Sequence, residues 1–276
     1  MKEKLEVGIE VGTIQETLLL PLWGRAFETR KPEPRLVDEK AVEIVERLDY
    51  DFSGIEETQA FSQHGWVARS LQTDEMALGF IEAHPEATIV NIGCGMDTTF
   101  SRIDNGRILF YELDLPEVIE LRKNFYEEND RHRSIPASFL EAGWFSQIEV
   151  RDGLLFLAGG VLYYFTEHEI RDFFVRAADH FGACEFFFDS LSPLGVEIGK
   201  RQVLKKGGME MSAGGGWGLK RAKDLESWDP RFEVVSSTSM SKGLYGGLPL
   251  KTKLMFLMPD VLGIASMVHL RAGADK

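Results

Sequence analysis

Short apolar runs alternate with helix-length stretches from Ala87 to the end of the chain, and no other feature constrains the fold as strongly. Parallel strands joined by crossover helices produce this alternation. We expect strands at Thr88–Ile92, Ile108–Leu113, Ile135–Phe139, Leu154–Leu157, Cys184–Asp189, Phe232–Ser236 and Leu254–Met258. The fourth and fifth are apolar at nearly every position, as central strands covered on both faces are. The sequence therefore predicts an α/β fold with a doubly wound, mostly parallel sheet.

Helices are predicted between these strands and ahead of them. Pro116–Asn129 follows the second strand, and Glu167–Phe181 follows the fourth, where Thr166 and Glu169 form a capping box. Ahead of the sheet, Asp38 precedes an apolar stripe at helical spacing and predicts an N-capped helix. The first third of the chain is therefore expected to be a helical appendage.

Charge and hydropathy exclude several classes of function. The formal net charge of −13 opposes the phosphate backbone of nucleic acid, so we expect no nucleic-acid partner. The longest apolar run, Leu154–Phe165, is shorter than the roughly 20 residues that span a bilayer, and the N-terminus does not read as a secretory signal. With only two cysteines, Cys94 and Cys184, the chain is predicted to be cytoplasmic and to have no membrane partner.

A glycine turn, Gly93-Cys94-Gly95-Met96-Asp97, follows the first predicted strand. Glycine lacks the Cβ that would keep a ligand away from the backbone, so the turn predicts a binding site. The third glycine of the dinucleotide fingerprint is missing, which favours a ligand without phosphates over a nicotinamide dinucleotide. We interpret Cys94 as a small packing residue.

Two acids stand at the end of the second predicted strand. Asp114 follows Gly93 at about the 20-residue separation at which a carboxylate reaches a ribose diol. Glu112 points to the same face because side chains alternate along a strand, so either acid could hold the hydroxyls. Alternatively, Asp114 only caps the helix that begins at Pro116. Joined to the glycine turn, the binding role is favoured.

These residues also carry a family resemblance. The runs Gly93–Phe100 and Tyr111–Pro116 resemble the leucine carboxyl methyltransferase family, especially its bacterial branch resembling the tetracenomycin-polyketide O-methyltransferase. Further matches are Leu20–Ala26, Asp49–Phe52, Ser138-Phe139 ahead of Trp144, and Gly160–Phe165. The resemblance spans roughly residues 15 to 190. It implies a class I S-adenosylmethionine-dependent methyltransferase with a Rossmann-like sheet.

The resemblance also implies where the cofactor S-adenosylmethionine lies. Arg69 matches an arginine that pairs with the cofactor carboxylate, and a guanidinium fork suits that partner. The methionine portion would lie near Gly93, the ribose on Asp114, and the adenine beside Ser138 and Phe139. The expected cofactor-binding residues are Arg69, Gly93, Gly95, Asp97, Glu112, Asp114, Ser138, Phe139 and Gly160.

One position departs from the family pattern. Many members carry a glutamate where this chain has Gly159, so we expect a polar contact near the amino end of the cofactor to be missing. A catalytically degenerate module that only binds S-adenosylmethionine therefore stays open beside the favoured O-methyltransferase. A nicotinamide-dependent oxidoreductase is the least favoured alternative.

Methyl transfer depends mainly on aligning the acceptor with the methyl carbon and excluding water. Tyr164, after the fourth predicted strand, is the candidate for orienting the acceptor, although it could instead pack beneath the next helix. Arg25 could hold an anionic acceptor or form a surface pair. The acceptor is expected to be a small molecule with a hydroxyl or a carboxylate. His64 is interpreted as structural, no metal is expected, and no oligomeric state is predicted.

We expect one domain of 276 residues with four parts. They are a helical cap (1–86), a cofactor-binding half (87–190), a possible lid insertion (191–225) and C-terminal strands (226–276). Within the insertion, the glycine-rich stretch 205–218 is the part expected to close over the acceptor, because long loops in compact domains are usually functional or disordered.

Overall fold

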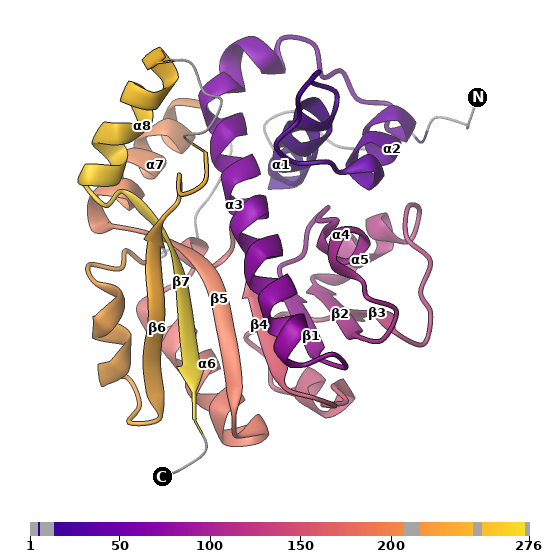
Figure 1. Cartoon of the computed structure of the whole chain (residues 1–276), viewed down its shortest axis with the longest axis vertical. Coiled ribbons are helices and arrows are strands. Elements are labelled where there is room, and N and C mark those ends of the chain that lie inside the picture. The colour runs from indigo at the N-terminus through magenta and orange to yellow at the C-terminus, as the bar shows by residue number, and fades with distance from the viewer. Residues whose placement is uncertain (1–4, 6–13, 207–215, 245–249, 274–276) are drawn as a thin grey trace.

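A seven-stranded sheet with the order β3-β2-β1-β4-β5-β7-β6 forms the centre of the computed structural model (Figure 1). The model describes residues 5, 14–206, 216–244 and 250–273. The strands are β1 (Thr88–Ile92), β2 (Leu109–Asp114), β3 (His132–Pro136), β4 (Leu154–Ala158), β5 (Cys184–Leu191), β6 (Phe232–Ser239) and β7 (Ala265–Ala272). β1 to β5 pair in parallel, and β7 runs antiparallel to β5 and β6. The predicted doubly wound, mostly parallel sheet is confirmed, with β4 and β5 inside it.

Helices cover both faces of this sheet. They are α1 (Ile14–Thr29), α2 (Glu39–Arg47), α3 (Ile55–Ala83), α4 (Thr99–Ile103), α5 (Pro116–Arg122), α6 (Glu167–Phe181), α7 (Pro193–Lys206) and α8 (Leu250–Val261). Three short 3₁₀ segments are η1 (Gly143–Gln147), η2 (Leu162–Tyr164) and η3 (Ala222–Ser227). In Figure 1, α3 crosses the front of the sheet, α6 lies behind it, and α1 and α2 sit above the carboxyl ends of the strands. The N-terminal helices are therefore placed over the edge where ligands bind in such sheets.

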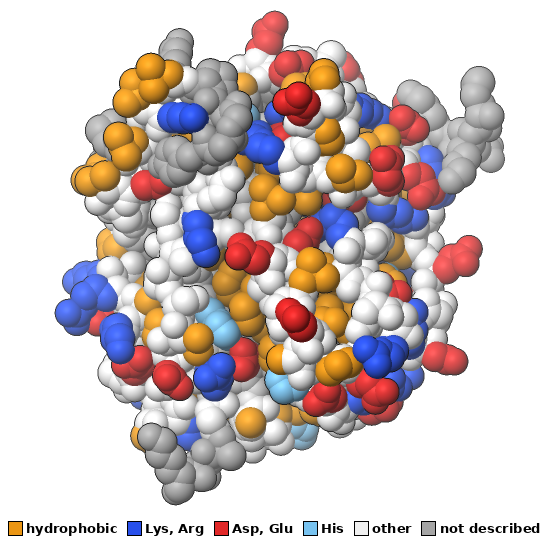
Figure 2. All heavy atoms as spheres, in the orientation of Figure 1, with side chains coloured by type: hydrophobic (Ala, Val, Ile, Leu, Met, Phe, Trp, Pro, Cys, Tyr) orange, Lys and Arg blue, Asp and Glu red, His pale blue; other side chains and the backbone are white. Residues whose placement is uncertain are grey.

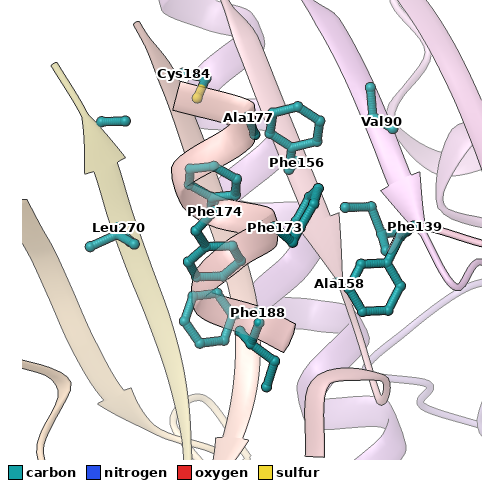
Figure 3. Packing of buried hydrophobic residues seen from close by; sticks show 14 of the residues in the cluster. Val90, Phe139, Phe156, Ala158, Phe173, Phe174, Ala177, Cys184, Phe188 and Leu270 are labelled. Atoms are coloured by element: carbon teal, nitrogen blue, oxygen red, sulfur yellow. The ribbon is translucent and has the colours of Figure 1, made fainter. Parts of the chain in front are cut away.

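Alternating strand residues supply two apolar cores, one on each face. Val90 and Phe156 belong to the core on the α6 side, in which Phe156 packs against Phe173 (Figure 3). Ile89 and Leu155 point to the other side and pack with the side chains of α3. Burying each large apolar side chain contributes roughly 1.5–3 kcal/mol. The two cores thus fix the strands, and with them the loops at the carboxyl ends.

The two predicted helix starts are confirmed. The Asp38 carboxylate accepts a hydrogen bond from the backbone N–H of Ala41 at 2.9 Å, which caps α2. Thr166 and Glu169 form the reciprocal capping box at the start of α6. Both caps satisfy backbone N–H groups that the first helical turn leaves free.

The predicted strand Leu254–Met258 is wrong, because these residues lie in α8. A short apolar run has no periodicity that separates a strand from a helix. Here Leu250, Leu254, Leu257 and Val261 recur at helical spacing and are exposed, and Figure 2 shows apolar side chains gathered over α8. The last strand is β7, whose polar His269 lies among its inward-facing residues and conceals the pattern.

Two predicted boundaries also move. The helix expected to reach Asn129 ends at Arg122, whose side chain turns inward beneath the glycine turn. β3 begins at His132, three residues ahead of the predicted start, and its side chain is buried against Phe100 at a ring separation of 4.0 Å. A histidine stacked on an aromatic ring can occupy an inward position of a strand, and this was not expected from its polarity.

The possible lid insertion begins with α7, a helix that the sequence did not predict. Residues 207–215 of the predicted lid lie outside the described residues. Beyond them, Trp217 is buried in the α6-side core, and its backbone N–H donates to the carbonyl of Phe165 at 3.1 Å. Trp217 is therefore part of the packed domain. Across the described helices, none is both long enough and apolar enough to cross a membrane.

Candidate functional site

The glycine turn lies at the carboxyl end of β1. Gly93 and Gly95 have φ values of +58° and +48°, a left-handed conformation that side chains with a Cβ rarely adopt. A Cβ on Gly93 would clash with Cγ2 of Val161, which follows β4. The turn therefore needs glycine at position 93 for two reasons, its conformation and its close approach to the neighbouring loop. Because Gly93 and Gly95 have no side chain, the backbone of the turn is uncovered at the edge of the sheet.

Gly93→Ala should lower the free energy of unfolding by about 1–3 kcal/mol more than Gly106→Ala does. Both glycines have positive φ, at +58° and +78°, but a Cβ at Gly106 would have no atom within 4 Å. The Gly106 variant therefore measures the conformational strain alone, and the difference measures the clash with Val161. Urea unfolding of both variants gives the comparison. Equal losses would mean that the contact with Val161 costs nothing.

Asp114 stands beside this turn at the end of β2. Its Oδ2 accepts a hydrogen bond from the backbone N–H of Gly95 at 2.7 Å, and Oδ1 accepts one from Leu115 at 2.7 Å. Burial raises the pKa of the Asp114 carboxyl above its ordinary value, although the two N–H donors act against it. A partly buried acid is thus fixed against the glycine turn.

Glu112 lies deeper than the sequence suggested. Its side chain is 1% exposed, and its carboxylate accepts hydrogen bonds from Arg122 at 2.6 Å and from Asn91 at 3.0 Å. Both oxygens are therefore engaged beneath the turn. The expectation that Glu112 or Asp114 could equally hold a diol is corrected, because only Asp114 lies next to the backbone of the turn.

Arg122 of α5 was not predicted as a site residue. Its Nη1 donates to the carbonyl of Gly95 at 2.6 Å and to that of Asp97 at 3.1 Å, while Nη2 pairs with Glu112. The guanidinium is almost fully buried, so these partners replace the water that it would otherwise hold. Arg122 therefore fastens the glycine turn from below.

Arg25 is buried, which corrects the surface pair that was one of its predicted roles, while the other role, holding an anionic acceptor, stays a prediction. It is 4% exposed, its Nε pairs with Asp38 at 2.9 Å, and its Nη2 donates to the carbonyl of Met96 at 2.9 Å. Arg102 of α4 adds contacts to Asp38 at 2.8 Å and to Asp74 at 2.6 Å. This buried charge network joins the N-terminal helices to the end of the glycine turn.

Asp97, the last residue of the turn, belongs to the same network. Its Oδ2 accepts a hydrogen bond from the Asn91 amide at 2.9 Å. Burial alone would raise the pKa of the Asp97 carboxyl, but the charges of Arg25 and Arg102 outweigh burial and lower it to about 2. Asp97 is therefore an anion at neutral pH, and its side chain stays 25% exposed.

Arg69 of α3 reaches the loop after β4, on the other side of the glycine turn. Its Nη1 pairs with Oδ2 of Asp189 at 3.0 Å, and Oδ1 of Asp189 accepts from the backbone N–H of Gly160 at 2.6 Å. Gly160 has a φ of +84°, and a Cβ there would lie 2.7 Å from Arg69 Nη1. Because Val161 touches Gly93, the guanidinium, the Gly160 turn and the glycine turn form one contiguous group.

Tyr163 and Tyr164 follow in η2, and their ring centroids lie 4.8 Å apart. Burial raises the pKa of both phenols, and the nearby charge of Arg69 only partly offsets it. Both tyrosines are therefore protonated at neutral pH and can donate hydrogen bonds. Tyr164 stays the candidate for orienting an acceptor.

Ser138 and Phe139 follow β3, next to the strand that carries Asp114. The backbone of Ala137 bonds the carbonyl of Asp114 at 2.9 Å, which places this segment beside the acid. Phe139 is 5% exposed, and its ring packs edge-on against Phe165 at 4.7 Å. Its side chain is thus part of the α6-side core (Figure 3), and the partly exposed Ser138 is the residue at the surface.

His64 lies in a second polar cluster between α1 and α3. Its Nδ1 is 3.0 Å from Nη2 of Arg35, whose Nε pairs with the fully buried carboxylate of Glu28 at 2.8 Å. Burial first, and then the charges of Arg35 and Lys31, lower the pKa of His64 to about 4. His64 is therefore neutral at physiological pH and accepts a hydrogen bond.

This lowered pKa predicts a pH-dependent stability. Below about pH 6.5 the unfolded chain binds a proton at His64, whereas the folded chain does not until about pH 4, so stability falls within this window. Between about pH 7.5 and about pH 5, His64 should account for a loss of about 1–2 kcal/mol. His64→Gln should remove this part, as measured by urea unfolding at both pH values. An equal loss in both proteins would contradict a neutral His64.

Comparison with known proteins decides the family. A model of the leucine carboxyl methyltransferase family matches residues 19–178, more than half of the chain. The chain belongs to the leucine carboxyl methyltransferase family. The glycine turn, Asp114, Arg69 and Gly160 all lie within the matched span.

Relatives of this methyltransferase have names that agree with this assignment. It is 32% identical over 234 residues to the tetracenomycin polyketide synthesis O-methyltransferase TcmP of Streptomyces glaucescens, which covers 84% of this chain and 85% of the relative. It is 28% identical over 183 residues to the S-adenosyl-L-methionine-dependent methyltransferase dpfgK of Gibberella zeae, covering 60% and 61% of the two chains. The cofactor is therefore S-adenosylmethionine, and the nicotinamide alternative is set aside.

A solved structure shares the fold of the methyltransferase. A putative methyltransferase from Thermobifida fusca superposes with a TM-score of 0.55 at 12% identity, covering 91% of this chain and 94% of that chain. At this identity the likeness concerns the fold. It agrees with the class I methyltransferase architecture that the resemblance implied.

Sequence reasoning missed two buried groups of the methyltransferase site, Arg122 and Asp189. Asp189 had a visible signal, because an acid directly follows the three phenylalanines Phe186–Phe188 near the carboxyl end of a central strand. Arg122 had no comparable signal, since a basic residue in the last turn of a helix is ordinary. In the described parts of the chain, no group of three or more potential metal ligands occurs.

Proposed function

We propose that this methyltransferase transfers the methyl group of S-adenosylmethionine to an oxygen of a small molecule. The observation that carries the proposal is that Gly93, Gly95 and Asp114 meet at one edge of the sheet, with Arg69 against the adjoining loop. The relation to a polyketide O-methyltransferase supports oxygen as the target.

The residues present fit the cofactor. Gly93 and Gly95 leave the backbone open, and Asp114 offers a carboxylate that can accept hydrogen bonds from a ribose diol. Arg69 offers further N–H donors for the carboxylate of the methionine portion, because its contacts with Asp189 and with the Tyr163 phenol do not use all five N–H groups of the guanidinium. When bound, S-adenosylmethionine supplies an electrophilic methyl carbon on a sulfonium centre. The protein aligns the acceptor and excludes water.

Tyr164 is proposed to donate a hydrogen bond to the acceptor oxygen. Because burial keeps it protonated, it orients the acceptor and does not remove a proton. A carboxylate acceptor is already anionic at neutral pH, whereas a phenol would need a separate proton acceptor. Both acceptor classes therefore stay within the proposal, and neither requires nucleic acid or a membrane.

We also propose a cytoplasmic location. Cys94 and Cys184 are free, buried thiols, and burial raises the pKa of both. Thiols in this state suit a reducing compartment.

The test combines ligand binding with product analysis. Saturating S-adenosylhomocysteine should raise the midpoint of thermal unfolding by several degrees, because a ligand that binds only the folded state stabilises it. Incubation with deuterated-methyl S-adenosylmethionine and a panel of polycyclic phenols and aromatic carboxylic acids should give a product three mass units heavier than the natural methyl ether or ester. Mild alkaline hydrolysis releases methanol from an ester but not from an ether, so it separates the two classes. Binding without any product across the panel would favour the degenerate module instead.

A further inference from the structure

Asp189 is a buried carboxylate at the carboxyl end of β5, in the middle of the candidate site. It is 3% exposed. Each of its oxygens has a separate partner: Oδ1 accepts from the backbone N–H of Gly160 at 2.6 Å, and Oδ2 pairs with Nη1 of Arg69 at 3.0 Å. One side chain thus ties the strand, the loop after β4 and the arginine of α3 together.

The contacts define where the Arg69 guanidinium lies. The Gly160 turn is so close that a Cβ there would be 2.7 Å from Nη1 and 3.1 Å from Nη2. The turn blocks one side of the guanidinium, and Asp189 holds its Nη1 end. A long arginine side chain otherwise has considerable rotamer freedom, which binding would have to remove.

The ion pair also accounts for the burial of both charges. A buried guanidinium or carboxylate without a partner is strongly unfavourable, whereas a well-placed pair with an additional backbone hydrogen bond offsets that cost. Arg69 still has N–H donors beyond Nη1, since a guanidinium carries five. The pair therefore positions Arg69 and leaves it able to bind a second carboxylate.

We propose that Asp189 is the positioning residue for the amino-acid end of the cofactor: by holding Arg69 and the Gly160 turn, it aims the guanidinium at the cofactor carboxylate. This inference rests on the proposed role of Arg69 in binding that carboxylate. The chain has Gly159 where many family members carry a glutamate, and Asp189 of β5 supplies an acidic group near the same arginine. Position 159 also lies next to Arg69, because a Cβ there would be 3.6 Å from the Cδ of Arg69.

The test compares two ligands that differ only at the amino-acid end. S-adenosylhomocysteine carries the carboxylate and the amino group, whereas 5′-methylthioadenosine has the same nucleoside and sulfur but lacks both. Asp189→Asn keeps the shape and an oxygen that can accept from Gly160, but it removes the charge that holds Arg69. We expect calorimetric titration to show a loss of about tenfold or more in affinity for S-adenosylhomocysteine, and less than about twofold for 5′-methylthioadenosine.

Glu185→Gln serves as the matched control, because Glu185 is another ion-paired acid of β5 whose partners, His269 and Arg271, lie on β7. It should leave both affinities unchanged. Asp189→Ser is the second variant, should the asparagine variant not fold. An unchanged affinity for S-adenosylhomocysteine, or an equal loss for both ligands, would overturn the positioning role. If the unmodified protein bound neither ligand, the proposed function would fail instead.

Discussion

Arg122→Leu should lower the free energy of unfolding by about 3–5 kcal/mol, because it leaves the Glu112 carboxylate buried without its charge partner. It also removes the Arg122 hydrogen bonds to the carbonyls of Gly95 and Asp97, at 2.6 and 3.1 Å, although the Asp97 carbonyl keeps its donor in the Tyr126 hydroxyl at 2.8 Å. The unpaired carboxylate and the lost hydrogen bonds both lie beneath the glycine turn, so the turn should lose its support. The expected result is a protein that unfolds at much lower urea concentration and binds S-adenosylhomocysteine poorly even below its unfolding transition.

A double variant separates the charge from the turn. Arg122→Leu combined with Glu112→Leu removes both buried charges, so it should be less destabilising than the sum of the two single variants. Lys123→Leu is the matched control, since Lys123 is the next residue and forms an exposed pair with Glu120; its stability should hardly change. Additive losses in the double variant would contradict a coupled buried pair.

Asp114→Ala should reduce the affinity for S-adenosylhomocysteine and for 5′-methylthioadenosine together, by about 100-fold or more. Two hydrogen bonds from a diol to a carboxylate are worth about 1.5–3 kcal/mol each, and the support of Gly95 is lost as well. Both ligands carry the ribose, so the affinity for each should fall. This distinguishes Asp114 from Asp189, whose replacement should affect only the ligand with the carboxylate.

Two further variants separate the loss of the Asp114 charge from a general effect on the fold. Asp114→Asn keeps an oxygen for the Gly95 N–H and gives up only the hydrogen bond from the exposed Leu115, so it should still fold, but it should bind both ligands weakly. Asp152→Ala removes an acid that pairs with His84 away from the turn, at 3.2 Å, and should not change either affinity. Normal binding by Asp114→Asn would limit Asp114 to supporting the glycine turn through the Gly95 N–H.

The parallel strands β1 to β5 and the glycine turn at their carboxyl edge could be predicted because local signals carry them. The glycine turn Gly93–Asp97, the acid at Asp114 and the apolar runs of β1, β4 and β5 are each visible in a few consecutive residues. Carboxyl ends of parallel strands meet at one edge, so these local signals converge without knowledge of the packing.

Contacts between distant residues could not be predicted in the same way. Arg25 and Asp38 lie 13 residues apart, and Arg69 and Asp189 lie 120 apart, so their pairing depends on how helices dock on the sheet. Period-two alternation placed Glu112 and Asp114 on one face of the sheet. It could not show that the Glu112 side chain is buried beneath the turn while Asp114 contacts the Gly95 backbone. In α8, Leu250, Leu254, Leu257 and Val261 face outward, which is the case where a hydrophobic run misleads.

The network around Asp38 couples the docking of the N-terminal helices to the ordering of the glycine turn. Asp38 caps α2 and also accepts hydrogen bonds from Arg25, Arg102 and the Thr98 hydroxyl, so its carboxylate is shared between the cap and the start of α4. Whatever orders the turn must then tighten the docking of α1 and α2, by the same free energy with which docking favours the ordered turn. Cofactor binding at the turn should therefore protect the N-terminal helices from cleavage. A protease that cuts between α1 and α2 should act more slowly as the cofactor concentration rises.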